Sequence, residues 1–177
     1  MRGRCPTQGI GTKPLADRPL EMIGRRLSPL QANAEGSVSA PADKVYHYLA
    51  DMRQHHPRFL PAAFSDFEVE TGGIGAGTVI RYQIRIGGRS RSVRAEVGEP
   101  EPGRTLTESE TGSSAVTTFT VTPAGTSSRV RISSEWAGAR GIGGFFERLF
   151  APRVLRRLFG DELRRLDAYA RSLSELQ

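Results

Sequence analysis

The chain has 177 residues, of which 37% are hydrophobic, so a single domain with one apolar core is expected. Its one cysteine, Cys5, excludes an internal disulfide framework and a cysteine-rich zinc site, and it fits a reducing compartment. The formal net charge is +6, and no apolar run approaches the ~20 residues that a membrane-spanning helix needs.

Residues 1–32 are predicted to form a disordered basic tail. They hold six basic residues against two acidic ones, and prolines and glycines interrupt them without a sustained hydrophobic period. About +2 of the net charge is left for a folded domain over residues 33–177. A twin arginine at 25–26 and an A-x-A triplet at 32–34 resemble export signals, but no apolar segment separates them, so a cytoplasmic protein is expected.

The folded part opens with a predicted strand at residues 35–39 and a helix over residues 40–51. Pro41 suits the first turn of that helix, because the amide hydrogen it lacks would have no partner there. Pro57 should end helical structure, since the residue before a proline is pushed out of the α region. The helix presents an apolar face formed by Val45, Tyr46, Tyr48 and Leu49.

After Pro61 the hydrophobic period changes from that of a helix to that of a strand. The clearest strand is 78–86, where isoleucines and Tyr82 alternate with polar residues. Further strands are predicted at residues 67–69, 93–97, 105–110, 116–121 and 129–136. Short turns and one polar face on each strand indicate an antiparallel sheet that is covered on one side.

The C-terminal segment has a helical period. Pro152 either begins a second helix or kinks one long helix that starts near Phe145. Residues 152–173 alone would span about 33 Å at ~1.5 Å per residue, enough to cover the apolar side of the sheet. The apolar stripe consists of Leu155, Phe159, Leu163, Leu166, Ala170 and Leu173. The order strand, helix, run of strands and long helix makes the fold class α+β.

Several stretches together resemble a known superfamily. VSAPADKVYHYLADMRQHHPRFLP (38–61) is similar to the first part of SRPBCC (START-like) proteins, with Phe59 where those proteins usually have tryptophan. GGIGAGTVIRYQI (72–84) resembles their glycine-led hairpin, and APRVLRRLFGDELRRLDAYA (151–170) resembles their final helix. The resemblance covers roughly residues 33–173, and the most similar subgroup is that of polyketide cyclase/dehydrase-type proteins.

This resemblance implies the helix-grip fold, in which a curved antiparallel sheet wraps around a long C-terminal helix and leaves a hydrophobic cavity. The superfamily includes lipid and quinone binders, polyketide cyclases and aromatases, so the fold alone leaves function open. The leading hypothesis is binding of a hydrophobic small molecule. The alternatives are a cyclase, aromatase or dehydratase that uses the same cavity, and a domain whose Phe145–Phe159 helix docks on a membrane or a protein.

Three residues are candidates for acid/base chemistry: Glu108, Tyr82 and His56. Glu108 shares a strand face with Leu106, so it points inward if Leu106 does, and burial would then raise its pKa. Tyr82 lies on an apolar face, where its hydroxyl can orient a ligand. The alternatives are an exposed glutamate, a tyrosine that only packs in the core and a solvated histidine.

Apolar residues that face the predicted cleft are the candidates for ligand contact. They are equally suited to plain core packing, and the sequence does not separate the two roles. The predicted ligand-binding set is Phe59, Ile80, Tyr82, Ile84, Phe119, Ile132, Trp136, Phe145, Phe146 and Leu149.

All three histidines lie within residues 46–59. His47, Asp51 and His55 have the i, i+4, i+8 spacing that would stack metal ligands on one face of a helix. Pro57 interrupts that helix and no fourth ligand is evident, so neither a metal nor a cofactor is predicted.

Two glycine clusters imitate nucleotide-binding loops. GGIGAG (72–77) leads into a strand rather than a helix, and GARGIGG (138–144) has the wrong glycine spacing and no strand pattern after its helix. Their glycines are interpreted as residues that permit turns and let the last helix approach the sheet closely. No nucleic-acid partner is predicted either, because no aromatic residues interleave with the basic residues of the outer face, Arg81, Arg85, Arg129 and Arg131.

Overall fold

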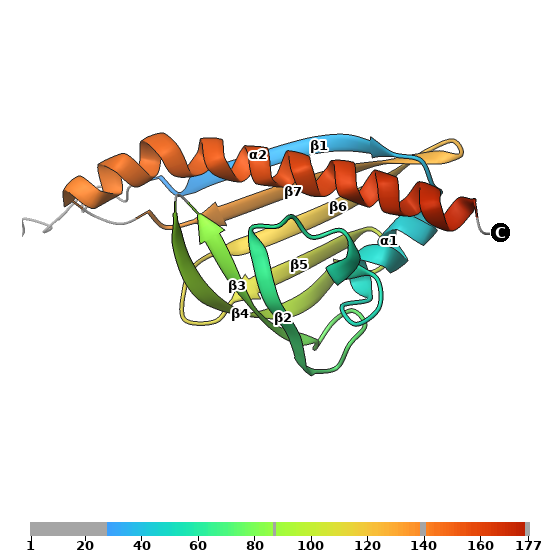
Figure 1. Cartoon of the computed structure of the whole chain (residues 1–177), viewed down its shortest axis with the longest axis horizontal. Coiled ribbons are helices and arrows are strands. Elements are labelled where there is room, and N and C mark those ends of the chain that lie inside the picture. The colour runs from blue at the N-terminus through green and yellow to red at the C-terminus, as the bar shows by residue number, and fades with distance from the viewer. Residues whose placement is uncertain (1–27, 87, 139–140, 176–177) are drawn as a thin grey trace, which may run out of the picture.

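The computed structural model describes residues 28–86, 88–138 and 141–175, and for residues 141–149 it describes the backbone alone. The described chain forms one antiparallel sheet, a short helix, a 3₁₀ turn and one long helix (Figure 1). In chain order the elements are β1 (Leu30–Val38), α1 (Ala42–Ala50), η1 (His56–Arg58), β2 (Phe64–Thr71), β3 (Val79–Ile86), β4 (Arg89–Glu101), β5 (Thr105–Glu110), β6 (Val116–Ala124), β7 (Ser127–Trp136) and α2 (Gly141–Ser174).

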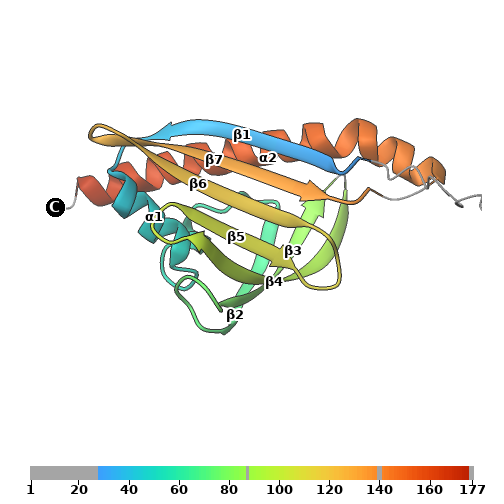
Figure 2. The ribbon, with the colours of Figure 1, turned by 180° about the vertical axis from the view of Figure 1, so that it is seen from behind.

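The seven strands have the order β1-β7-β6-β5-β4-β3-β2, and all neighbours are antiparallel. The first strand therefore pairs with the last, and the chain crosses through α1 to start again at the opposite edge. α2 runs along β1 and β7 on one face of the sheet (Figure 1). In the view from behind, the sheet lies in front of α2 (Figure 2). The predicted α+β arrangement, a curved sheet around a long C-terminal helix, is confirmed.

β1 starts earlier than the sequence predicts. The expected strand covered residues 35–39, whereas β1 runs over Leu30–Val38 and takes in residues assigned to the tail. Its inward positions include Ala34 and Gly36, whose small side chains carry a weak hydrophobic signal. The prediction of disorder for residues 1–27 lies outside the described residues.

α2 is a single helix of 34 residues with Pro152 inside it. Of the two alternatives for this proline, the long helix is correct, and it extends over about 51 Å at ~1.5 Å per residue. Its buried stripe faces the sheet, with Phe159, Leu163, Leu166 and Ala170 all less than a tenth exposed. The helix approaches β1 closely, since a Cβ built on Gly36 would lie 3.5 Å from the Cβ of Leu163.

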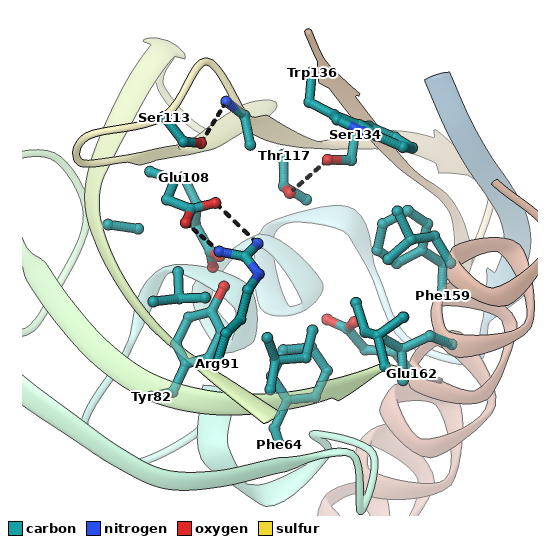
Figure 3. A pocket seen from close by; sticks show the side chains of 18 of the residues that line it. Phe64, Tyr82, Arg91, Glu108, Ser113, Thr117, Ser134, Trp136, Phe159 and Glu162 are labelled. Atoms are coloured by element: carbon teal, nitrogen blue, oxygen red, sulfur yellow. Dashed lines mark hydrogen bonds and ion pairs between the residues drawn. The ribbon is translucent and has the colours of Figure 1, made fainter. Parts of the chain in front are cut away.

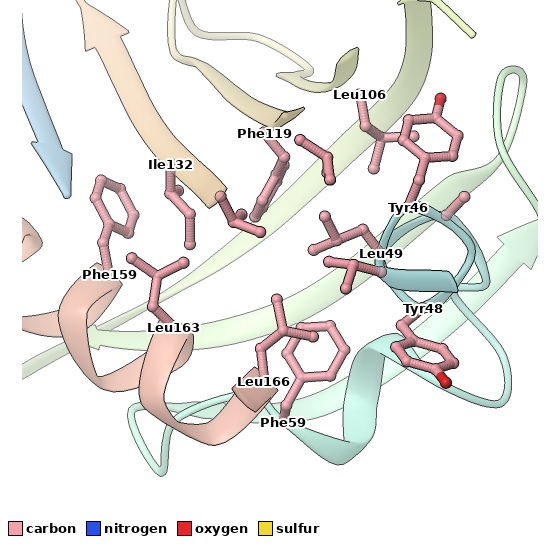
Figure 4. Packing of buried hydrophobic residues seen from close by; sticks show 14 of the residues in the cluster. Tyr46, Tyr48, Leu49, Phe59, Leu106, Phe119, Ile132, Phe159, Leu163 and Leu166 are labelled. Atoms are coloured by element: carbon pink, nitrogen blue, oxygen red, sulfur yellow. The ribbon is translucent and has the colours of Figure 1, made fainter. Parts of the chain in front are cut away.

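The packed core lies at the end of the sheet where α1 sits. α1 directs its apolar face toward α2 and the sheet, as its sequence period predicts (Figure 4). Leu49, Phe59, Leu106, Ile132 and Leu166 are completely buried there. This end of the molecule is filled with side chains.

The glycine cluster at 72–77 forms the turn between β2 and β3 and anchors the end of α1. The Gly75 amide donates to the Ala50 carbonyl at 3.0 Å, and the Met52 amide donates to the Gly73 carbonyl at 2.9 Å. Gly75 has a φ of 62°, a conformation that glycine adopts without strain. These glycines have a structural role in the turn, in agreement with the interpretation from sequence.

Candidate functional site

A cavity of about 750 Å³ lies between the inner face of the sheet and the middle of α2 (Figure 3). Side chains from β2 to β7 and from α2 line it, and they include Phe64, Phe67, Ile84, Val93, Leu155 and Leu158. The volume falls within the ~300–1,000 Å³ that is usual for small-molecule pockets. The sheet and the terminal helix thus face each other without filling the space between them.

The structure divides the predicted ligand-binding residues into three groups. Those that line the cavity are Tyr82, Ile84, Phe119 and Trp136. Phe59, Ile80 and Ile132 are fully buried core residues instead, each 0% exposed, and they do not line it. Strand alternation identified the inward face of Ile80 and Ile132 correctly but not the part of that face that α1 and α2 cover. Phe59 lies outside the strands, directly after η1. The third group consists of Phe145, Phe146 and Leu149, for which the structure describes the backbone alone.

Glu108 points into the cavity from β5. Leu106 is completely buried, and the two-residue period of the strand carries Glu108 to the same face. The Glu108 side chain is 9% exposed, and its Oε1 atom has no hydrogen-bond partner among the described residues. Burial raises the pKa of this carboxyl from an ordinary 4.5 to about 7.

A second buried carboxyl enters the cavity from α2. Glu162 is 3% exposed, and its Oε1 atom also lacks a partner within the described part of the chain. Burial, and then the nearby charges of Glu108 and Asp161, raise its pKa from 4.5 to about 8. The sequence analysis did not include this residue, although Glu162 lies three residues after Phe159 and four before Leu166, on the buried stripe.

His56 lies beside Glu108 at the inner end of the cavity. Its Nδ1 atom is 2.9 Å from the carbonyl oxygen of Leu49, which can only accept, so Nδ1 carries the proton and Nε2 has the free lone pair. That Nε2 atom is 3.7 Å from Glu108 Oε1. Burial lowers the pKa of His56 to about 4, so the imidazole is neutral at physiological pH.

Tyr82 stands among aromatic rings on the sheet side of the cavity. Its ring is 5.3 Å from that of Phe64 and stacks on that of Phe67 at 6.1 Å. Burial, reinforced by the carboxylates around it, raises the pKa of the phenol, which therefore stays protonated as a hydrogen-bond donor. Tyr82, Glu108 and His56, the predicted acid/base candidates, all line the same cavity.

Polar groups mark the more open side of the cavity. Arg91 forms a two-pronged ion pair with Glu110, and its side chain is 54% exposed while that of Glu110 is 13% exposed. Thr117 donates to Ser134 at 3.2 Å across β6 and β7. The cavity therefore has a charged rim on this side, while most of the side chains that line it are apolar.

His47, Asp51 and His55 lie outside this cavity. The sequence argument held that the break before Pro57 would separate His55 from His47, because α1 could not continue so far. α1 does end at Ala50, but the turn that follows brings His55 back beside His47. The nearest ligand atoms of the three side chains all lie within 4.8 Å of one another.

The basic residues of the outer face are balanced by acidic neighbours. Arg81 forms ion pairs with Glu68 and Glu70, and Arg129 pairs with Glu35 at 3.4 Å. Such exposed pairs contribute little stability, but they reduce the positive potential of this face. Among the described residues, no helix is long and apolar enough to cross a membrane.

Residues 30–171 match the family described as "Polyketide cyclase / dehydrase and lipid transport". The chain belongs to this family, which confirms the resemblance found in the sequence. A comparison with curated proteins finds no match.

Solved structures share the fold over most of the chain. The KanY protein is 34% identical, with a TM-score of 0.73 over 82% of this chain and 99% of that one. The Zhui aromatase/cyclase from Streptomyces sp. R1128 is 16% identical, with a TM-score of 0.68 over 81% and 94% of the two chains. A START superfamily protein from Mycobacterium smegmatis is 15% identical, with a TM-score of 0.63 over 78% and 97%. The last two likenesses establish the helix-grip fold.

Proposed function

We propose that the protein binds a hydrophobic small molecule, a lipid, quinone or polyketide-like compound, in the cavity between the sheet and α2. The observation that carries this proposal is a pocket of about 750 Å³ whose wall is largely apolar but contains two buried carboxyls. The family, whose description includes cyclases, dehydrases and lipid transport, supports it. The single cysteine leads us to place this binding in the cytoplasm.

Apolar burial supplies the affinity. A ligand that buries about 400 Å² of apolar surface gains about 10 kcal/mol at ~25 cal/mol per Å². Lost translational and rotational freedom removes at least about 4 kcal/mol of this. At the smallest of these costs, the remaining ~6 kcal/mol corresponds to a dissociation constant of tens of micromolar before any polar contact contributes.

The two carboxyls favour a ligand that carries oxygen atoms. Below their raised pKa values, Glu108 and Glu162 are neutral acids with a hydrogen to donate. A carbonyl oxygen of a quinone or polyketide-like ligand would accept it, whereas a pure hydrocarbon would leave the buried groups unsatisfied at about 1–3 kcal/mol each. The cavity therefore suits carbonyl-bearing ring systems better than simple alkyl chains.

Trp136 provides a direct test, because it lines the cavity and is the only tryptophan in the chain. Titration with 2-methyl-1,4-naphthoquinone should quench its fluorescence with a saturable, micromolar dissociation constant. Ala115→Phe, which adds a ring at the cavity wall, should weaken binding at least tenfold. Ala124→Phe, an exposed substitution at the end of β6, is the matched control and should bind as the wild type does.

Quenching that rises linearly without saturation, or an equal dissociation constant for Ala115→Phe, would contradict the proposal. Native mass spectrometry of the protein purified from its own host would then identify the natural ligand. Pure binding predicts that this compound is released chemically unchanged.

The second candidate function is a cyclase, aromatase or dehydratase, and the carboxyl pair favours it. Burial raises the pKa of both carboxyls toward neutrality, so near pH 7 one member of the pair can be ionised and act as a base while the other stays protonated and acts as an acid. In a dehydration, Glu108 would remove a proton from the carbon next to a carbonyl. Glu162 would protonate the departing β-hydroxyl, and water and a carbon–carbon double bond would result.

An assay that follows loss of water from a β-hydroxy thioester of a polyketide-like acid distinguishes the two functions. Under the enzyme hypothesis, Glu108→Gln abolishes turnover while naphthoquinone binding persists. Absence of turnover by the wild type would leave binding as the function. The third hypothesis, in which the start of α2 docks on a membrane or a protein, is not favoured. Phe150 is 53% exposed, but the side chains of the neighbouring phenylalanines lie outside the described residues, so no exposed aromatic patch supports it.

A further inference from the structure

The cluster of His47, Asp51 and His55 has the composition and proximity of a metal site. It lies at the end of α1 near the C-terminal end of α2, in a hollow that His47, His55 and Leu173 help to line. One ligand atom from each of the three side chains lies within 4.8 Å of the other two. Asp51 is buried, His55 is half-buried and His47 is exposed, so an ion would be held at the surface with one side open.

The backbone brings these residues together without a continuous helix. α1 ends at Ala50, and the next residue, Asp51, has φ and ψ of −83° and 93°, which turn the chain out of the helix. The amides of His55 and His56 then both donate to the Asp51 carbonyl, at 3.3 and 2.8 Å, and close a tight turn. As a result the His55 ring packs against that of His47 with 5.1 Å between the ring centroids.

Asp51 is held rigidly in this turn. Its Oδ1 atom accepts hydrogen bonds from the amides of Arg53 and Gln54 at 3.0 and 2.8 Å. Its backbone is also bridged to Ile74 in the glycine-rich turn. A carboxylate offers about four lone-pair positions, so these bonds leave capacity for a metal ion. Ligating carboxylates in metal sites are commonly supported by such hydrogen bonds.

His55 is oriented by a partner on another element. Its Nδ1 atom lies 2.7 Å from the hydroxyl oxygen of Tyr169 on α2. When one ring nitrogen of a histidine is engaged in this way, the other is left to face a metal, and the ring orientation is fixed. The three side chains therefore do not lie along one helix, as their spacing in the sequence suggests. They form a site to which α1, the following turn and α2 all contribute.

We propose that His47, Asp51 and His55 bind a divalent first-row transition metal ion, with zinc as the first one to test. Two imidazoles and one carboxylate are ligands that zinc accepts in tetrahedral sites with one position open. With bonds of about 2.0–2.1 Å, neighbouring ligand atoms in such a site are about 3.4 Å apart. Because the three ligand atoms already lie within 4.8 Å of one another, shifts of about 1 Å would bring them to this separation.

A bound ion would connect α1 to α2 at the packed end of the fold. His47 belongs to α1, Asp51 and His55 to the turn, and Tyr169 supports the site from α2. Metal binding to the folded state alone stabilises it, so the melting temperature should rise with zinc concentration. A cluster with a purely structural role would stabilise the fold to the same extent with and without zinc.

The test is a zinc titration of the full chain, without a histidine tag and with Cys5→Ser to remove the only thiol. Calorimetry should show one zinc ion per chain, and Co²⁺ should give the visible bands of a tetrahedral site. His47→Gln and His55→Gln should each weaken zinc binding at least tenfold. Tyr169→Phe, which removes only the supporting hydroxyl, should weaken it about 10- to 100-fold.

Lys44→Gln is the matched control, because Lys44 lines the same hollow and an ammonium group does not bind zinc at neutral pH. It should bind zinc as the wild type does, and zinc should raise the melting temperature of both proteins but not that of His55→Gln. Equal zinc affinity in the wild type and the two histidine variants would overturn the proposal. So would the absence of stoichiometric binding at zinc concentrations of tens of micromolar.

Discussion

Glu108 Oε1 and His56 Nε2 lie 3.7 Å apart at the buried end of the cavity. Burial moves the two pKa values in opposite directions, to about 7 for Glu108 and to about 4 for His56. Each shift favours the uncharged form, so between about pH 4 and pH 7 the two groups face each other as a neutral acid and a neutral base. This arrangement keeps a proton available to a ligand without placing a charge in an apolar wall.

Stability should fall as the pH rises from 5 to 8, because the two buried carboxyls must ionise. Glu108 and Glu162 have raised folded-state pKa values, so their contribution is full below about pH 4.5 and is lost as the pH rises through about 7 and 8. Each contributes a slope of about −1.4 kcal/mol per pH unit between its unfolded and folded pKa values. His56, whose pKa is lowered, opposes this slope only below about pH 6.5.

Urea denaturation of the wild type and of Glu162→Gln at pH 5, 6.5 and 8 measures this dependence. The amide cannot ionise, so the variant should lose about one carboxyl's share of the slope and be relatively more stable at pH 8. Glu96→Gln, an exposed substitution on β4, is the control and should leave the slope unchanged. Parallel curves for wild type and Glu162→Gln would show that Glu162 ionises normally.

Replacement of Glu108 by leucine should change the preference for ligands that carry oxygen. Loss of one hydrogen bond to a ligand carbonyl corresponds to about 0.5–1.5 kcal/mol, up to about a tenfold loss of affinity. Glu108→Leu should therefore bind 2-methyl-1,4-naphthoquinone up to tenfold more weakly but bind 2-methylnaphthalene, which has no carbonyl, at least as well. Glu108→Gln retains a donor and should stay close to wild type. Calorimetry with the two compounds separates these outcomes.

The sequence predicted the fold well because each element carries a local signal. Alternation in β3 placed Tyr82 on the inner face, and the helical stripe identified α2. In β5 the alternation only tied the face of Glu108 to that of Leu106, and the structure shows that both face inward. Ile80 and Ile132 show the limit of that signal. They share the inner face with cavity residues, but whether a position is packed or open depends on where α1 and α2 cross the sheet.

The sequence-based prediction missed contacts between segments that are distant in the chain, because local patterns carry no information about them. Glu162 was not included among the site residues, and it is buried because α2 turns this side chain toward the cavity that Glu108 also lines. His55 was separated from His47 because the argument followed helix geometry, while a turn outside the helix joins them. In both cases the three-dimensional path of the chain decides the environment.

Gly75 and Gly77 allow a matched test of the turn that supports the end of α1. Both have positive φ, 62° and 81°, so alanine at either position is strained by about 1 kcal/mol. Only at Gly75 would the new Cβ collide, with Oε2 of Glu99. This carboxylate is held in place, because its Oε1 accepts a bond from the Tyr46 hydroxyl at 2.6 Å and its Oε2 accepts one from the Ala76 amide at 2.8 Å. Gly75→Ala should lower the free energy of unfolding by at least about 1 kcal/mol more than Gly77→Ala. Equal losses in urea titrations would show that the Glu99 contact is unimportant.

Two leucines of α2 lie in different surroundings, one in the packed core and one at the cavity, so their substitutions should have different effects. Leu166 is 0% exposed among core side chains, so Leu166→Ala leaves a void and should lower the free energy of unfolding by about 2–5 kcal/mol. Leu158 is half-buried and lines the cavity, so Leu158→Ala enlarges an existing space and should lower it by about 1 kcal/mol. Ligand binding should show the opposite pattern. Leu158→Ala loses a contact with the ligand, so it should bind naphthoquinone more weakly, whereas folded Leu166→Ala should bind it about as the wild type does. Guanidinium denaturation measures stability and the Trp136 titration measures ligand binding, both on the same samples. If Leu158→Ala lost more stability than Leu166→Ala, the space beside Leu158 would have to be filled by the protein itself.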